Sequence, residues 1–326
     1  MRVRSIKLVL AAISLVVATS AQAVIALPYS ALYVFGDSLS DSGNNSNVPG
    51  IGANPGQVIS SNSYIPSQTY SAAPFGTYSN GPVWTSYFAS MLGVSALPSL
   101  IGGTNYAFGG ARTTGGMVPS LTTQTGMFLA STGGTAPGSA LYVVAGGGNN
   151  ARATIDAIGG GASAGSTIFN DASKYANDVG LIVDNLQAAG AQNIIVWNTP
   201  NLGASPAALA SGALGSFLGT LTADAMNAAL SARLTGETGV KIFDVFGLAN
   251  LPGAAVFTNT TTACGFSGAD CATSLFWDGI HPTTAAHGFI AQQMFALAVP
   301  EPSEIAMMLA GFLVVVGAAR RRKIAT

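Results

Sequence analysis

Three polar side chains with complementary chemistry lie far apart in this sequence. Ser38 stands in Leu32–Asn44, LYVFGDSLSDSGN, directly after an apolar run, and His281 follows Asp278 by three residues in DGIHPT. A serine hydroxyl becomes a strong nucleophile when an imidazole takes its proton and a carboxylate orients that imidazole. Asp278 could accept the Nδ1–H of His281 and leave Nε2 for Ser38. The three residues predict acyl transfer through a serine nucleophile, whereas the alternative for Ser38 is a solvated turn.

Two other residues could imitate parts of this arrangement. The sequence has two histidines, and His287 lies inside a predicted helix without a nearby carboxylate, so a structural or exposed role is predicted for it. Gly161–Gly165, GASAG, matches the G-x-S-x-G pattern around Ser163. That pattern requires a strand before the serine and a helix after it. No apolar run leads into Ser163, so the match is interpreted as compositional chance.

Short apolar runs alternate with helix-like stretches along the chain. The runs predict strands at Ala31–Phe35, Leu141–Ala145, Asn193–Trp197 and Val240–Phe243. The helix-like stretches are Ala172–Ala189, Leu218–Leu234 and Thr284–Ala298. Continuous apolar strands suit burial on both faces, and the alternation predicts crossover connections and a parallel sheet. The predicted fold class is therefore α/β.

The candidate site residues follow the ends of these runs. Ser38 follows the first strand, Asn149 follows the second, and Asp278 and His281 directly precede the last helix. Active sites of open parallel sheets gather beyond the carboxyl ends of the strands, so these positions should converge. Segments rich in small residues, at 102–116, 132–140 and 159–166, are predicted loops, the last of them a flexible insertion.

The amino-terminal segment has the layout of a secretory signal peptide. Arg2, Arg4 and Lys7 precede an apolar run, Leu8–Ala18, and the small-residue sequence Ala21–Ala23 follows. We expect a signal peptide over residues 1–23 with cleavage after Ala23, and a signal anchor is the alternative. The protein is therefore predicted to be exported.

The carboxyl-terminal segment, residues 299–326, resembles the PEP-CTERM sorting signal of Gram-negative bacteria. Val299–Pro302, VPEP, precedes the apolar run Ile305–Ala319 and the basic cluster Arg320–Lys323. Fifteen residues of helix cover about 22 Å, less than the roughly 30 Å of a hydrocarbon core. The resemblance implies transient membrane contact through this tail, processing by an exosortase-type enzyme, and an extracellular or cell-surface location reached through the periplasm. A plain tail anchor is the alternative.

The remaining chain suits one sizeable domain with a weakly acidic surface. Seven of the twelve Lys and Arg residues lie in the terminal segments, which leaves five basic and eleven acidic residues between 24 and 298. Without a basic cluster, nucleic acid is not an expected partner. Cys264 and Cys271 are the two cysteines, and in an oxidising compartment they predict one local disulfide. Two free thiols or half a zinc site are the alternatives, but neither a metal site nor a cofactor is expected.

Five sequence blocks, in order, resemble the GDSL branch of the SGNH-hydrolase family. They are FGDSLSDSGN, YSNGPVWTSYFASMLG, TNYAFGGART, LYVVAGGGNN and DGIHPT, with NTPNLGASPAA as a further similar stretch. The second block is similar to plant-type and autotransporter esterases of this branch. The resemblance implies a three-layer, flavodoxin-like α/β fold over residues 28–298.

The resemblance also implies roles for individual residues. Ser38 would be the nucleophile, with Asp278 and His281 completing the triad. The oxyanion hole would comprise the backbone N–H groups of Ser38 and Gly110 and the side-chain amide of Asn149. Preorganised donors of this kind lower the barrier to acyl transfer by roughly 3 kcal/mol each. Asp37 and Asp41, which flank the nucleophile, are predicted to cap the following helix or turn.

The third block departs from the family pattern at one position. Gly147–Asn150 reads GGNN where the family has Gly-x-Asn-Asp. The oxyanion donor Asn149 is kept, but an amide replaces the carboxylate that organises the loop. A less rigid loop and lower activity are the expected consequences.

These observations predict an exported serine esterase or lipase that cleaves a small ester or acylated substrate through an acyl-enzyme. One alternative is an O-acetyl esterase of the same family that acts on polysaccharide. The other is a catalytically silent surface or matrix protein, whose mark would be a broken triad. The triad positions in this sequence are all occupied.

Overall fold

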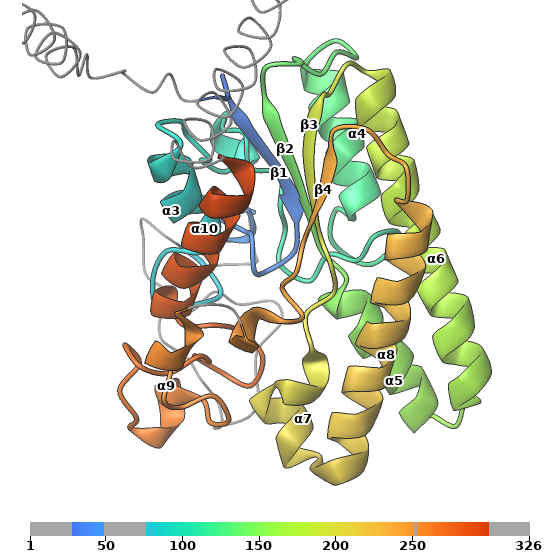
Figure 1. Cartoon of the computed structure of the whole chain (residues 1–326), viewed down its shortest axis with the longest axis vertical. Helices are drawn as coiled ribbons and strands as arrows, with labels where there is room; N and C mark the ends of the chain where they lie inside the picture. Colours follow the sequence, from blue (N-terminus) through green and yellow to red (C-terminus); the bar gives the residue numbers. More distant parts are fainter. Residues whose placement is uncertain (1–27, 49–75, 251–252, 300–326) are drawn as a thin grey trace, which may run out of the picture.

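A parallel sheet of four strands forms the centre of the molecule (Figure 1). The computed structural model describes residues 28–48, 76–250 and 253–299, so the predicted signal peptide and nearly all of the predicted sorting signal lie outside the described residues. In sheet order the strands are β1 (Leu32–Gly36), β2 (Leu141–Ala145), β3 (Asn193–Trp197) and β4 (Val240–Phe243). Three strands match the sequence prediction at both ends, and β1 is shifted by one residue. The predicted α/β class with a parallel sheet is confirmed.

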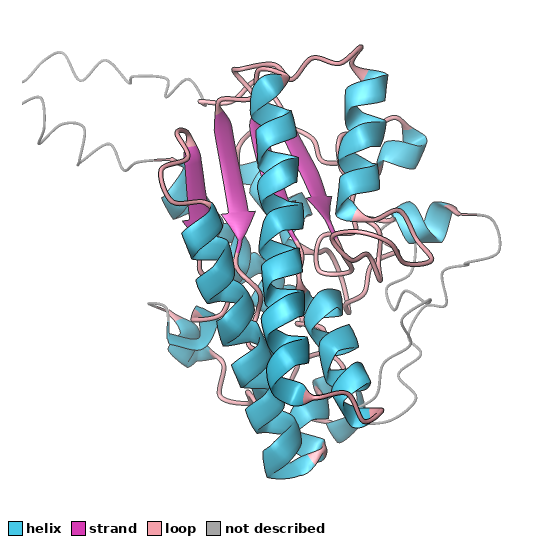
Figure 2. Cartoon of the chain, turned by 90° about the vertical axis from the view of Figure 1, so that its right-hand side faces the viewer, coloured by secondary structure: helices cyan, strands magenta, loops and turns pink. Residues whose placement is uncertain are grey.

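Helices cover both faces of the sheet, as the turned view in Figure 2 also shows. The α-helices are α2 (Asn44–Asn47), α3 (Trp84–Met91), α4 (Leu121–Ser131), α5 (Gly148–Gly159), α6 (Ala164–Ala188), α7 (Pro206–Ala210), α8 (Gly212–Arg233), α9 (Cys264–Ser267) and α10 (Thr284–Ala298). Short 3₁₀-helices lie at Ser99–Ile101, Leu202–Ala204, Leu248–Asn250 and Ala254–Val256. The predicted helix Thr284–Ala298 agrees with α10 at both ends.

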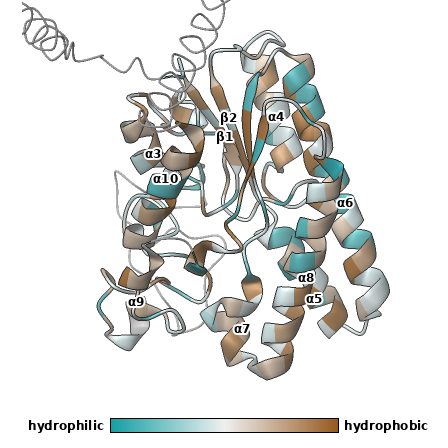
Figure 3. Ribbon diagram, viewed as in Figure 1, coloured by the Kyte–Doolittle hydropathy of each residue, from teal (hydrophilic) through white to brown (hydrophobic). Residues whose placement is uncertain are grey.

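Two apolar cores fix the three layers. Val34, Val143 and Ile195 point to one face of the sheet, where they pack with α3 and α10. Their strand neighbours point to the other face, toward α4, α6 and α8. Because successive side chains of a strand face opposite sides, a strand buried on both faces must be apolar throughout. Figure 3 shows these hydrophobic strands between the two helical layers.

Several helices differ from the sequence prediction. α6 begins at Ala164 and α8 at Gly212, eight and six residues before the predicted starts. Half of the predicted loop over residues 159–166 is helix, because α5 ends at Gly159 and α6 begins at Ala164, with only a short turn between them. The sequence prediction also missed α3, α4 and α5. The small residues that suggested loops are here tolerated within helices that pack against the rest of the fold.

Two glycines, Gly203 and Gly219, allow one backbone segment to lie unusually close to another. A Cβ at Gly203 would lie 2.1 Å from the backbone oxygen of Ser216, and one at Gly219 would lie 2.7 Å from the nitrogen of Gly203. Gly203 belongs to the 3₁₀-helix Leu202–Ala204, whereas Gly219 lies within α8. Glycine therefore serves backbone contact at these positions rather than flexibility.

The described chain enters and leaves the domain at the same end. The Tyr29 hydroxyl donates to the carbonyl oxygen of Ala298 at 2.9 Å, which joins the segment before β1 to the end of α10 (Figure 1). The parallel strands run away from this point, so their carboxyl ends lie at the opposite end of the sheet. Within the described residues, no helix combines the length and apolar character needed to cross a membrane.

Candidate active site

The structure brings together the three residues of the predicted triad. The Oγ atom of Ser38 lies 2.9 Å from Nε2 of His281, and Nδ1 of His281 lies 2.7 Å from Oδ2 of Asp278. The three residues are 8%, 2% and 0% exposed, respectively. With Nδ1–H donated to Asp278, the free Nε2 can accept the hydroxyl proton of Ser38. This is the geometry of an activated serine nucleophile.

The end of β1 presents Ser38 at the edge of the sheet. Gly36, the last strand residue, cannot carry a side chain, because a Cβ there would lie 2.6 Å from the carbonyl oxygen of Ala145. The side chain of Gln124 in α4 pairs with Gly36, accepting from its N–H at 2.8 Å and donating to its oxygen at 2.9 Å. Asp37 then accepts from the Leu39 N–H at 3.0 Å, which turns the chain. Sequence reasoning missed Gln124, whose signal is an amide between Leu121 and Phe128 on the buried side of α4.

A tight turn places His281. Oδ1 of Asp278 accepts from the backbone N–H groups of Ile280 at 2.8 Å and His281 at 2.6 Å. Asp278 therefore holds both the backbone and the imidazole of His281. α10 begins after this turn, where the Thr283 hydroxyl accepts from the Ala286 N–H at 3.1 Å. Pro282 lies just before this cap.

The predicted disulfide between Cys264 and Cys271 is present, which excludes the free-thiol and zinc alternatives. α9, which begins at Cys264, is joined to the segment that leads into the triad. The N–H groups of Cys264 and Gly265 each donate at 3.0 Å, to the carbonyl oxygens of Phe276 and Trp277, respectively. The disulfide therefore braces the residues directly before Asp278.

Gly110 has the backbone properties expected of an oxyanion donor. Its φ of 85° lies in the left-handed region that favours glycine. The N–H of the preceding Gly109 donates to Asp41, but those of Gly110 and Ser38 donate to no acceptor in the described part of the chain. Gly110 is therefore the better candidate of the two glycines, although it does not line the cavity beside Ser38.

The side chain of Asn149 is held beside this segment. Its Nδ2 donates to the carbonyl oxygen of Ala111 at 3.0 Å, and its Oδ1 lies 3.4 Å from a guanidinium nitrogen of Arg152. An amide nitrogen carries two hydrogens, so one remains for a ligand. Asn149 and Ser38 line the same cavity.

Asp41 caps the segment after the nucleophile, as predicted. Its carboxylate accepts from the backbone N–H groups of Gly43, Asn44 and Asn45, at the start of α2, and also from Gly109. It thereby ties α2 to the loop that carries Gly110. Burial raises the pKa of Asp41 to about 6, against the opposing effect of these four donors. Burial also raises the pKa of Asp37 to about 6.

A mostly apolar cavity of about 130 Å³ opens beside the triad. Ser38, Asn149 and His281 form part of its wall, and its apolar residues include Leu39, Pro200, Leu202, Val245, Phe246, Leu248, Leu275, Ile280 and Ile290. Arg152 also lines it, a residue that sequence reasoning missed. Arg152 could have been found from the sequence, because it is one of only five basic residues between 24 and 298 and follows Asn149 by three positions. Among the described residues, no group of three or more His, Cys, Asp or Glu side chains could hold a metal ion.

The two imitating residues lie apart from this arrangement. Ser163 is exposed at the start of α6 and follows a turn rather than a strand. His287 is fully buried in α10, and neither ring nitrogen has a hydrogen-bond partner among the residues that the structure describes. Of the two predicted possibilities for His287, a structural role in the core fits this burial, and an exposed position does not. Burial lowers the pKa of His287 to about 3, with a smaller contribution from His281.

Replacing His287 with leucine should make the protein less sensitive to acid. An unfolded histidine titrates near 6.5, so between pH 6.5 and pH 3 the unfolded state binds the proton and the folded state does not. Stability present at neutral pH is lost as the pH falls through this window. Between pH 6.5 and 5, the wild type should lose about 2 kcal/mol more unfolding free energy than the variant. Denaturant titrations of both proteins across this range measure the difference, and equal losses would contradict the assignment.

Comparison with known proteins identifies the family of this chain. The family model described as GDSL-like Lipase/Acylhydrolase matches residues 32–294, which include the triad and both further oxyanion candidates. Lipase 1 of Photorhabdus luminescens is 32% identical over 180 residues, which cover 55% of this chain and 23% of that protein. The match thus spans about a quarter of the relative's length. The family match supports ester hydrolysis as the general activity, and this chain belongs to the GDSL-like lipase/acylhydrolase family.

Proposed function

We propose that the protein is an exported serine esterase that hydrolyses carboxylic esters with an apolar group near the scissile bond. The observation that carries this proposal is the continuous contact from Ser38 through His281 to Asp278, at 2.9 and 2.7 Å, beside an apolar cavity. The side chains of Ser38 and Asp278 already lie within hydrogen-bond distance of that of His281, so proton transfer from Ser38 to His281 requires no movement of these side chains.

In the first half-reaction, Ser38 Oγ attacks the ester carbonyl carbon while Nε2 of His281 takes its proton. The carbon–alkoxide bond breaks, the imidazolium returns that proton to the leaving alkoxide, and the acyl group remains on Ser38. Asp278 stabilises the imidazolium through Oδ2. In the second half-reaction, water replaces the serine as nucleophile, and the same imidazole first accepts and then returns a proton. The products are an alcohol, a carboxylic acid and the free enzyme.

Three donors stabilise the negative charge that develops on the carbonyl oxygen. They are the N–H of Ser38, the N–H of Gly110 and the remaining Nδ2–H of Asn149. The two backbone groups have no other acceptor in the described residues, and the amide is fixed by Ala111. Donors that are already oriented require little reorganisation when the charge appears.

The cavity favours apolar esters over acetylated sugars. Its walls are mainly aliphatic and aromatic, with few polar groups beyond the triad, Asn149 and Arg152. A sugar placed there would lose hydration without gaining matching hydrogen bonds, whereas a short acyl or alkyl chain would gain burial.

Export is the second part of the proposal. It is supported by the layout of residues 1–23, by the PEP-CTERM-like sequence of residues 299–326, and by a disulfide of the kind that persists in oxidising compartments. The expected route leads through the periplasm of a Gram-negative bacterium to the cell surface or beyond. An exosortase-type enzyme would process the tail after transient membrane contact.

A substrate panel tests the activity. We expect the purified protein to hydrolyse p-nitrophenyl butyrate with a kcat/KM about tenfold above that for the acetate, because each buried methylene contributes about 0.8 kcal/mol. Acetylated xylan should be a poor substrate. Preference for acetate and rapid deacetylation of xylan would favour the polysaccharide esterase instead. Absence of turnover for every ester would favour the catalytically silent protein.

A further inference from the structure

The first turn of α5 forms hydrogen bonds with the loop that carries Gly110, at Ala111 and Thr113. Asn149 donates to the oxygen of Ala111 at 3.0 Å. Its neighbour Asn150 contacts Thr113 twice, because Oδ1 accepts from the Thr113 N–H at 3.0 Å and Nδ2 donates to the Thr113 hydroxyl at 2.9 Å. Asn150 thus organises this loop, contrary to the expectation that an amide at this position would leave it less fixed.

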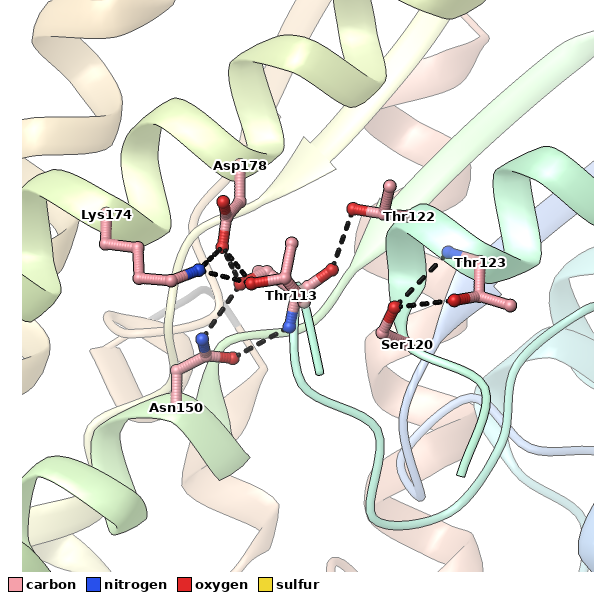
Figure 4. A network of polar contacts seen from close by, with 8 residues as sticks. Thr113, Ser120, Thr122, Thr123, Asn150, Lys174 and Asp178 are labelled. Atoms are coloured by element: carbon pink, nitrogen blue, oxygen red, sulfur yellow. Dashed lines mark hydrogen bonds and ion pairs between the residues drawn. The ribbon is translucent and has the colours of Figure 1, made fainter. Parts of the chain in front are cut away.

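Asp178 of α6 completes the arrangement (Figure 4). Its Oδ2 accepts from the hydroxyls of Thr113 at 2.7 Å and Thr114 at 2.8 Å. Lys174, one turn earlier in α6, pairs with the same oxygen at 2.7 Å and also contacts the Thr114 hydroxyl. Thr113 is fully buried, so its hydrogen bonds are shielded from competing water.

The direction of these hydrogen bonds explains the amide at position 150. A hydroxyl has a single proton, and Thr113 donates that proton to Asp178. The Thr113 oxygen must then accept from its other neighbour, which an amide nitrogen can satisfy and a carboxylate cannot. Two carboxylates would compete for one hydroxyl proton and repel each other. An amide on α5 therefore fits a carboxylate on α6.

We propose that Asn150, Thr113 and Asp178 are positioning residues of the oxyanion hole. They hold the loop that carries Gly110 against the helical turn that carries Asn149, so that two donors from separate segments face one point. This inference rests on the proposed serine esterase function. It assigns a role in transition-state stabilisation to a network that does not line the cavity beside Ser38.

Replacing Thr113 with valine tests the central contact. Valine keeps the branched shape and the backbone N–H but leaves Asn150 Nδ2 and one contact of Asp178 without a partner. Complete loss of one oxyanion donor costs about 10²–10³-fold in kcat, so displacement of a donor should cost about tenfold, with KM within about twofold. Thr113→Ser, which keeps the hydroxyl, should retain kcat within about threefold of the wild type.

Thr154→Val is the matched control. Thr154 is also a buried threonine, and its hydroxyl joins α5 to the carboxylate of Asp171 in α6 at 2.7 Å. The same hydroxyl lies 3.2 Å from the backbone oxygen of Asn150, within α5, and makes no hydrogen bond to the Asn150 side chain or to the described loop that carries Gly110. Both valine variants should lower Tm by about 2–4 °C, as expected for a loss near 1 kcal/mol. Only Thr113→Val should lower kcat.

Exchanging the amide and the carboxylate tests the direction of the network. Asn150→Asp should lower kcat about tenfold, because it leaves the Thr113 hydroxyl between two carboxylates that repel each other. Asp178→Asn should cost less, because its amide oxygen can still accept from Thr113, Thr114 and Lys174. The double variant removes one of the two carboxylates, so its kcat should rise well above that of Asn150→Asp and return to within about threefold of the Asp178→Asn variant. Such recovery is a coupling that independent structural effects would not produce.

The inference is overturned if Thr113→Val keeps kcat like its control, if the loss appears in KM alone, or if the double variant is no better than the worse single variant. If Thr113→Val does not fold, the comparison of Asn150→Asp and Asp178→Asn with their double variant tests the inference instead. These outcomes are separate from failure of the proposed function, which would appear as a wild type without esterase activity or as an active Ser38→Ala variant.

Discussion

Ser38→Ala is expected to lower kcat for ester hydrolysis by about 10⁵-fold or more, as for removal of the nucleophile in other serine hydrolases. The hydroxyl is the atom that bonds to the acyl group, and no other group replaces it. The fold should be unchanged, because a small side chain at the end of β1 contributes little to either core. Turnover of p-nitrophenyl butyrate and thermal unfolding, measured on the same preparation, check both parts.

A fluorophosphonate probe provides an independent reading. It should label the wild type at Ser38, and peptide mapping should find no label on the Ser38→Ala protein. Ser163→Ala is the control and should retain full activity, because Ser163 is exposed at the start of α6. Hydrolysis by a folded Ser38→Ala protein, or label on Ser163, would place the active site elsewhere.

His281→Ala should be about as damaging as Ser38→Ala, with a loss of about 10⁵-fold in kcat. The imidazole takes the serine proton and returns it to the leaving group, so each half of the pair is ineffective alone. The double variant Ser38→Ala with His281→Ala should therefore be no slower than either single variant. Asp278→Ala should cost less, because the carboxylate orients the imidazole and does not itself transfer the proton.

Stability must be separated from chemistry for His281. Alanine at this position removes a partner from the buried Asp278 carboxylate, which keeps its two backbone donors. His281→Gln supplies an amide donor of similar reach and should recover part of the lost stability without recovering activity. The His287→Leu variant serves as control and should hydrolyse esters like the wild type. If the His281→Gln protein hydrolysed esters like the wild type, the imidazole of His281 would not be the general base.

Strands β1, β2 and β3 could be predicted because they are buried on both faces of the sheet. Only apolar residues fit such strands, so Leu141–Ala145 and Asn193–Trp197 are short, uninterrupted and followed by polar or glycine residues. The three triad candidates could also be predicted from the sequence. Only two histidines could act as the base, and only His281 has a carboxylate close to it in the sequence. The structure adds the distances that join these segments.

The helices around the site could not be predicted in the same way. α5 follows directly after a run of glycines, begins with Asn149 and Asn150, and has only two large apolar residues, Ile155 and Ile158, so its sequence resembles a loop. The contribution of Gln124 depends on α4 lying beside the end of β1, a contact between residues 88 positions apart. Asn150 was read as a lost carboxylate, because its partner Thr113 and the carboxylate of Asp178 come together only through folding.

The hydrogen bond between Tyr29 and Ala298 has a consequence for how the domain can be tethered. Because the described chain begins and ends side by side, a linker attached at either end would leave from the same pole of the molecule. The strands point toward the opposite pole, where the cavity and the triad lie. An enzyme fixed to a surface by either end would therefore face outward, with its substrate entrance directed toward the medium.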